Sequence, residues 1–319
     1  MNIEWTPAAL AVEETLRTAL AGLGGVDLAR AAQADPAVRS ARLAPVLASL
    51  GVLELDAFGG EDEAAAAVLA VRACGAVVAP WPVARVLCVP ADARHEIDGL
   101  YVTDGSVRHL EHADLFDRAV AVPLSGDGGR SVTALGSPAG VPLDPFRVPV
   151  ALDGSAPMPF AARAAYLSAV LDAAWVAGSL AAVTQMAADY AATRRQFGQR
   201  IASFGEIRWR IADMVVAADG LDEIMAYTWY LQRRGSGTLA DALALRLAMQ
   251  DAADVVLKNG HQVFGAIGLC EEHDLAVIDR HLTPALLRPA GSQRTTQALL
   301  DAVNEDGFDA IFGVAPRQS

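Results

Sequence analysis

The chain has 319 residues, enough for two or three domains that each enclose a core. Hydrophobic residues make up 53% of it and charged residues 20%, a profile typical of long packed helices. The formal net charge of −13 argues against binding to nucleic acid or to an anionic membrane surface, although it leaves room for a local basic pocket.

Cysteine content and hydropathy limit the class of protein further. Cys74, Cys88 and Cys270 are too few and too scattered for a disulfide framework or a zinc site, and we expect buried thiols. The N-terminus lacks the features of a secretory signal, which predicts a cytoplasmic location. The most membrane-like stretch, Ala164 to Val183, contains Asp172 and fits a buried bundle helix better than a bilayer span.

The first part of the chain is predicted to be helical. Thr6-Pro7 offers an N-cap followed by proline at the first helical position. A second helix is expected from about Pro36 to Leu50. After a loop with two adjacent glycines, a third begins with an acidic first turn at Glu61 and runs to about Val78, where Pro80-Trp-Pro82 ends it.

The character of the sequence changes after residue 96. Leu100–Thr103, Phe116–Leu124 and Ser131–Leu135 are predicted to be short strands. Gly126-Asp-Gly-Gly129 could be mistaken for a phosphate-binding loop. It lacks the lysine, the hydroxyl and the strand-to-helix context of such a loop, so we expect a hairpin turn.

Three potential metal ligands, His109, Glu111 and His112, lie close together in this region. Their spacing suits neither one face of a helix nor one face of a strand, and no further ligands are evident. We therefore expect a solvated loop here and no metal site.

The rest of the chain is predicted to be long helices. They span roughly Ala161–Thr193, Glu206–Arg233 and Leu239–Phe264, with shorter helices after Glu271 and after Gly291. Apolar residues on the second recur on one stripe from Ile207 to Trp229. Long helices joined by short loops indicate an antiparallel bundle.

The turn between the first two of these helices carries the most specific motif. Arg194, Arg195 and Arg200 surround Gln196 and Phe197. Guanidinium and backbone N–H groups suit a phosphate, and an aromatic ring beside them suits a flat cofactor. The motif resembles the acyl-CoA dehydrogenase family, in which an Arg-x-x-Phe-Gly turn holds the adenosine diphosphate end of FAD. The alternative is an ordinary turn with surface arginines.

A second segment points the same way. Gln262-Val-Phe-Gly-Ala-Ile-Gly268 resembles the family's Gln-x-x-Gly-Gly-x-Gly segment, with Gly265 and Gly268 matching and Ala266 in place of a glycine. The resemblance implies that Arg194, Gln196, Phe197, Gln262, Gly265 and Ala266 contact FAD, in part across a subunit boundary. The alternative here is a helix C-cap at Gly268.

The order of elements also resembles this family. We expect a mostly α fold with a small β insert: an N-terminal helical domain over 1–96, a reduced β domain over 97–155 and a C-terminal four-helix bundle over 156–319. The family's middle domain is considerably longer than this one.

The family's catalytic glutamate has no counterpart here. Dehydrogenation of an acyl thioester needs a base placed at the α-carbon and stripped of water. The resemblance gives two positions for that glutamate, and in this sequence they are Ser168 and Ala290, so no catalytic residue is assigned. Asp172, one helical turn from Ser168, is either a relocated base or an interhelical or capping polar contact.

A chain that keeps FAD-binding elements without the base resembles the smaller subunit of heteromeric α2β2 acyl-CoA dehydrogenases that act on steroid or cholesterol side-chain CoA thioesters. The first hypothesis is therefore a subunit that completes the FAD site of a larger catalytic partner. The others are an independent homotetramer with a relocated carboxylate base, and a non-enzymatic helical protein.

Overall fold

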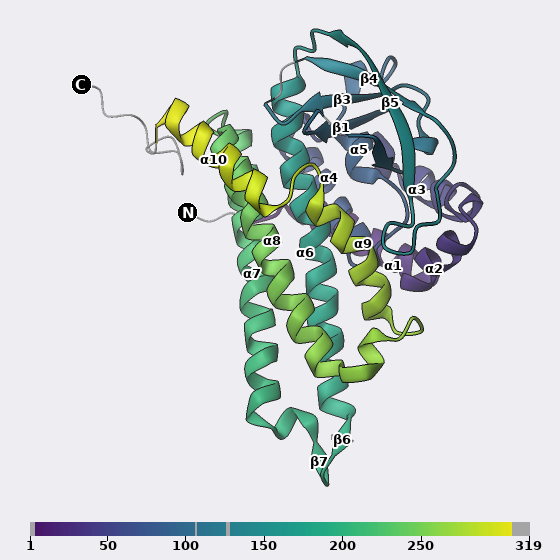
Figure 1. Ribbon diagram of the computed structural model, residues 1–319, viewed down its shortest axis with the longest axis vertical. Coiled ribbons are helices and arrows are strands. Elements are labelled where there is room, and N and C mark those ends of the chain that lie inside the picture. Colours follow the sequence, from purple (N-terminus) through teal and green to yellow (C-terminus); the bar gives the residue numbers. More distant parts are fainter. Residues whose placement is uncertain (1–3, 106, 126–127, 308–319) are drawn as a thin grey trace.

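The computed structural model describes residues 4–105, 107–125 and 128–307. Helices at the N-terminus, a small sheet and a bundle of long helices follow one another along the chain and pack together (Figure 1). The fold is mostly α with a small β insert, as the sequence predicts.

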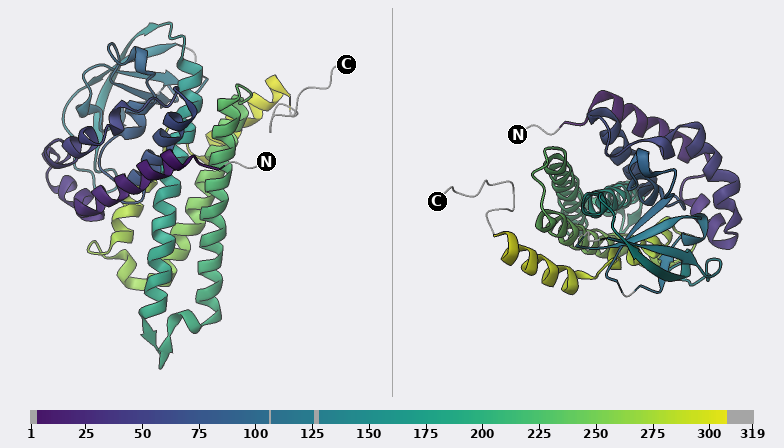
Figure 2. Two further views of the ribbon diagram at one scale, coloured as in Figure 1. Left: turned by 180° about the vertical axis from the view of Figure 1, so that it is seen from behind. Right: turned by 90° about the horizontal axis from the view of Figure 1, so that it is seen from above.

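The N-terminal helices wrap one side of the upper half of the bundle (Figure 2). Thr6 caps the first helix, because its Oγ accepts a hydrogen bond from the N–H of Ala9. The helices at 36–50 and from Glu61 are confirmed, whereas the second helix of the chain was not predicted. In order they are α1 (Pro7–Gly22), α2 (Val26–Ala34), a π-helical turn (Arg39–Leu43) that leads into α3 (Ala44–Ser49), α4 (Glu61–Gly75) and α5 (Val83–Leu87).

Among the described residues the sheet has five strands, two more than the sequence predicts. They are β1 (Gly99–Thr103), β2 (His109–Glu111), β3 (Ala119–Pro123), β4 (Gly129–Ala134) and β5 (Arg147–Ala156), in the spatial order β1-β3-β4-β5-β2. The β1–β3 pair is parallel and the other pairs are antiparallel. Within the Gly126–Gly129 turn, residues 126–127 lie outside the described residues.

The prediction of a solvated loop at His109, Glu111 and His112 is wrong. His109 and Glu111 lie on β2, which pairs with β5, and His112 is buried. The sequence misled because β2 has only three residues, too few for an alternating pattern to show. β5 was missed because Pro149 and Gly154 interrupt its apolar pattern.

The predicted helices of the bundle are confirmed. They are α6 (Ala161–Thr193), α7 (Gly205–Arg233), α8 (Leu239–Phe264), α9 (Asp274–Leu287) and α10 (Ser292–Asp306). A capping box fixes the start of α8, because Thr238 and Asp241 each accept a hydrogen bond from the other's backbone N–H.

Helix α6 is the centre of the molecule and packs against α4, α7 and α8. Glycine lets α4 approach it closely: a Cβ on Gly178 would lie 2.0 Å from the carbonyl oxygen of Arg72, and one on Gly75 would lie 1.9 Å from that of Trp175. Among the described residues α6 is the one helix long and apolar enough to span a bilayer, and 72% of its most apolar window is buried inside the protein. That burial explains its apolar composition as a core helix.

The prediction of buried thiols holds for two of the three cysteines. Cys74 and Cys88 are buried, and burial raises the pKa of each thiol to about 12. Cys270 is exposed, against the prediction, because it follows a 3-10 turn (Gly265–Leu269) that leaves the bundle surface.

Candidate functional site

The arginine motif forms a tight β-hairpin at the free tip of the bundle (Figure 1). Strands β6 (Arg195–Gln196) and β7 (Gln199–Arg200) pair antiparallel around the two residues Phe197 and Gly198. Both central residues have positive φ, 51° and 80°, the geometry of a two-residue turn that matches strand twist. The motif is therefore an ordered two-residue β-hairpin and more than a break between two helices.

The side chains of this hairpin face solvent. Arg194 and Gln196 are exposed, and Phe197 is 91% exposed. None of Arg194, Arg195 and Arg200 forms an ion pair with another described residue. The exposed aromatic ring and the guanidinium groups without ion-pair partners can therefore bind a molecule outside this chain.

The second motif lies at the same end of the bundle. Helix α8 ends at Phe264, whose ring centroid is 4.9 Å from that of Tyr190 near the end of α6. Gln262, Gly265 and Ala266 are exposed beyond this contact, and a Cβ on Gly265 (φ 61°) would meet no atom within 4 Å. The positive φ of Gly265 favours glycine, and this residue caps the C-terminus of α8. The helix therefore ends at Gly265, three residues before the C-cap considered at Gly268.

These residues fit one side of an FAD site. Cationic guanidinium groups can bind the diphosphate, and the Gln side-chain amides can hydrogen-bond the polar edge of the cofactor. The open space at Gly265 lets a ligand approach the backbone. Because all six predicted contact residues are exposed, a flavin held by them alone would lie largely in water. The set therefore fits a shared site better than an enclosed one.

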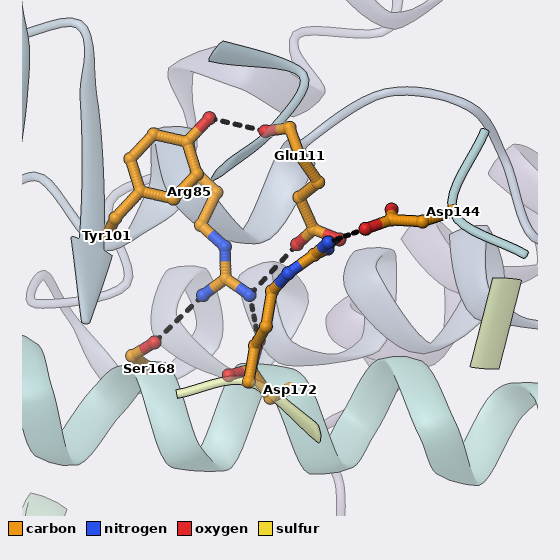
Figure 3. Close-up of polar contacts among 7 residues, drawn as sticks. Arg85, Tyr101, Glu111, Asp144, Ser168 and Asp172 are labelled. Carbon is orange, nitrogen blue, oxygen red and sulfur yellow. Dashed lines mark hydrogen bonds and ion pairs between the residues drawn. The ribbon is translucent and has the colours of Figure 1, made fainter. Parts of the chain in front are cut away.

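The positions expected for the glutamate lie elsewhere, near the upper end of α6. Ser168 is buried, and its hydroxyl oxygen accepts a hydrogen bond from Arg85 of α5 over 2.9 Å. The same guanidinium forms an ion pair with Asp172 over 2.7 Å (Figure 3). The interpretation of Asp172 as an interhelical polar contact is therefore confirmed.

Two further acidic groups complete this arginine cluster, which we define as Arg85, Arg288, Glu111, Asp144 and Asp172 (Figure 3). Glu111 lies between Arg85, at 3.3 Å, and Arg288, at 3.2 Å, and Arg288 also pairs with Asp144. Burial alone would raise the pKa of the Glu111 carboxyl, but the two guanidinium groups outweigh it and lower the pKa to about 2. Burial raises the pKa of Asp144 despite its own partner.

The second expected position, Ala290, is buried beside this cluster. Its carbonyl oxygen accepts hydrogen bonds from Arg246 over 2.8 Å and from Gln250 over 3.2 Å. Burial lowers the pKa of the Arg246 guanidinium to about 10. The Ser168 hydroxyl thus links α6 to α5, and the Ala290 carbonyl links the segment between α9 and α10 to α8. Neither of the two expected positions carries a carboxylate.

A cavity of about 70 Å³ lies against the cluster, with room for a few water molecules. Its lining includes Trp81, Arg85, Phe146, Asp172 and Trp175.

Sequence reasoning found the arginine turn but missed Arg85 and Arg288 as members of a cluster. Their partners are 26 to 177 residues away along the chain, so no local spacing connects them. One signal was available: Arg85 is a charged residue inside the apolar run Val83–Val89, and a charge in such a run is usually paired.

Comparison with known proteins agrees with this geometry. Residues 160–289 match the family model described as "Acyl-CoA dehydrogenase, C-terminal domain". Over 108 residues, 34% of this chain, the sequence is 31% identical to "Acyl-CoA dehydrogenase IpdE2" of Mycobacterium tuberculosis, and the match spans about a third of that relative (32%).

Solved structures resemble the whole chain. The ChsE4-ChsE5 complex from Mycobacterium tuberculosis matches with a TM-score of 0.75 at 17% identity, over 96% of this chain and 99% of the other. A variant of the Tcur3481-Tcur3483 steroid acyl-CoA dehydrogenase gives 0.74 at 16%, over 93% and 98%. Butyryl-CoA dehydrogenase from Megasphaera elsdenii gives 0.71 at 14%, over 95% and 100%. Residues 160–289 are therefore similar to an acyl-CoA dehydrogenase C-terminal domain, and the chain as a whole has the acyl-CoA dehydrogenase fold.

Proposed function

We propose that this chain is the non-catalytic subunit of a cytoplasmic, FAD-dependent acyl-CoA dehydrogenase complex, and that it completes the FAD site of a larger catalytic partner. The assembly would be a heterotetramer with two copies of each chain. Arg194, Gln196 and Phe197 of this chain would help to hold FAD, which would supply the hydride-accepting chemistry of the reaction, and a base of the partner would take the α-proton of the substrate.

One observation carries the proposal: the residues proposed to contact FAD are exposed, whereas the two positions expected for the base hold a buried serine and a buried alanine. The hairpin presents Arg194, Gln196 and Phe197 to solvent. Ser168, by contrast, is in contact with Arg85 and has no proton-accepting carboxylate. This combination suits a chain that supports a flavin without removing a proton itself.

The named relatives support the partner and the substrate class. Two of the similar structures are described as pairs of named chains, ChsE4-ChsE5 and Tcur3481-Tcur3483, and the second is described as a steroid enzyme. We therefore propose a second acyl-CoA dehydrogenase chain as the partner and a bulky, steroid-type acyl-CoA as the substrate, bound mainly by that partner.

The competing hypothesis is an independent enzyme with Asp172 as a relocated base. The carboxylate of Asp172 already binds Arg85 over 2.7 Å, so it would have to leave this partner before it could reach a substrate. A purely structural helical protein is the third possibility, and against it stands the cost of keeping a large apolar ring exposed at the hairpin tip.

The test is to express the chain alone and together with each candidate acyl-CoA dehydrogenase chain of the same organism, and to record flavin absorbance and acceptor reduction with steroid-type acyl-CoA. We expect little flavin and no turnover from the chain alone, and a yellow, active complex from the pair. Activity of the lone chain that is lost in Asp172→Asn, with flavin retained, would establish the relocated base. Absence of flavin with every candidate partner would favour the structural role.

A variant then separates the two chains' contributions within the complex. Arg194→Ala in this chain should reduce FAD retention, measured by absorbance after gel filtration, whereas Arg85→Lys should leave it unchanged. Unchanged flavin content in Arg194→Ala would contradict the role proposed for the hairpin.

A further inference from the structure

Three aromatic rings meet where the two segments proposed to contact FAD leave the bundle. The ring of Phe264, the last residue of α8, contacts those of Tyr190 and His273, with centroid separations of 4.9 Å and 4.4 Å. Phe264 is 4% exposed, and the other two residues are half-buried. We define Tyr190, Phe264 and His273 as the ring cluster. It joins the ends of α6 and α8 to the start of α9.

Each of the two FAD-contact segments starts from a member of the ring cluster. The N–H of Arg194 donates a hydrogen bond to the carbonyl oxygen of Tyr190 over 2.8 Å, so the hairpin leaves α6 one turn after this ring. Gly265 follows Phe264 directly and caps α8. The contact between Tyr190 and Phe264 therefore fixes the distance between the hairpin and the Gly265 turn.

His273 is the member of the ring cluster that is held from outside it. Its Nδ1 accepts a hydrogen bond from the N–H of Leu275 over 3.1 Å and so caps the start of α9. Arg30 of α2 donates to the carbonyl oxygen of Glu272 over 3.0 Å and forms an ion pair with Asp274 over 2.7 Å. The backbone is therefore anchored on both sides of His273, and its ring has little freedom to leave the cluster.

The imidazole of His273 is suited to both contacts because it is uncharged. Its Nδ1 can accept a hydrogen bond only while it carries no proton. Burial lowers the pKa of His273, and the nearby charge of Asp274 only partly opposes that shift. Arg30 and His261 lower the pKa further. At neutral pH the ring therefore packs against Phe264 as a neutral group and caps α9 at the same time.

We propose that His273 is a positioning residue for FAD: its ring holds the other two rings together and so sets the spacing of the hairpin and the Gly265 turn. This role rests on the proposed function, because those two segments carry the residues that would hold FAD. One side chain then has two separable tasks. The ring serves the flavin site, whereas the Nδ1 atom serves the stability of α9.

Two substitutions, made in the complex with the partner, separate these tasks. His273→Asn keeps a side-chain acceptor suited to a helix N-cap and removes the ring, whereas His273→Phe keeps a ring and removes the acceptor. We expect His273→Asn to weaken FAD binding by about fivefold to tenfold, because an aromatic contact is lost. His273→Phe should keep the FAD affinity within about twofold, because that contact is retained. Titration of the FAD-free complex, followed by flavin fluorescence, measures the affinity.

The melting temperature of the FAD-free complex shows that the difference in affinity is not a difference in stability. Both variants should lower it by about 2 °C, His273→Asn through lost packing and His273→Phe through the lost cap. Thr6→Ala is the matched control, since it removes the side-chain cap of α1, remote from the hairpin at the tip of the bundle (Figure 1). It should lower the melting temperature by a similar amount and leave FAD binding unchanged.

The proposal is overturned if His273→Asn binds FAD as tightly as the unsubstituted complex does. It is equally overturned if His273→Phe loses as much affinity as His273→Asn, or if Thr6→Ala weakens FAD binding to the same extent. An unsubstituted complex that takes up no FAD would overturn the proposed function itself, and the positioning role with it.

Discussion

Two groups of arginines in this protein have opposite surroundings. Arg85 and Arg288 lie between the sheet and the bundle, and three carboxylates satisfy them. Arg194, Arg195 and Arg200 lie at the exposed hairpin and form no ion pair with another described residue. Buried arginines with complete partners hold elements together, whereas exposed ones without partners remain available for a ligand. Substitutions in the two groups should therefore change different properties.

The largest expected effect is on stability, at Arg85. Arg85→Met should lower the free energy of unfolding by about 3–5 kcal/mol, because it leaves Asp172 and Glu111 buried with too little positive charge. Urea unfolding followed by circular dichroism measures this. Arg194→Met, the counterpart in the hairpin, should change stability by less than about 0.5 kcal/mol. Equal losses from the two variants would remove the distinction between the groups.

A smaller effect with a defined pH dependence is expected at Glu111. Its pKa is about 2 in the folded protein against an ordinary value of 4.5, so its contribution is fully present above pH 4.5 and is lost as the pH falls toward 2. Glu111→Gln should cost about 3 kcal/mol at pH 7. The difference from the unsubstituted protein should shrink below pH 4.5, and a pH-independent difference would contradict the ion-pair origin.

Titration of His281 should not change the free energy of unfolding at neutral pH. Its effect should appear only in acid. Burial, followed by the charge of Arg280, lowers its pKa to about 4 from an ordinary 6.5. The unfolded chain therefore takes up the proton first, and stability should fall between pH 6.5 and 4 by up to about 1.4 kcal/mol per pH unit. His281→Gln, which can keep the hydrogen bond to Gln33 seen at 2.7 Å, should flatten this slope. A slope equal to that of the unsubstituted protein would assign the acid sensitivity to other groups.

The same contrast explains what the sequence could predict. Helices α6 and α8 have the predicted bounds, because local signals mark their ends: the arginine turn after Thr193 and the capping box at Thr238. The hairpin residues lie within one short stretch and could be recognised together. The arginine cluster could not, since its members come from β2, α5, α6, the segment before β5 and the residue after α9, and only the fold brings these parts together. Asp172 was predicted to make a polar contact, but its partner was not identifiable.

The smallest expected effect concerns Phe197, whose φ of 51° is unusual for a residue other than glycine. Holding an aromatic residue there costs about 1 kcal/mol, and its side chain, 91% exposed, packs only edge-on against Phe204, with the ring centroids 6.2 Å apart. Asparagine tolerates this conformation, so Phe197→Asn should raise the stability of the lone chain by up to about 1 kcal/mol. In the complex with the partner the same variant should retain less FAD. A stability gain without loss of flavin would mean that the ring has no role in binding, and that the strain at the tip serves only the geometry of the turn.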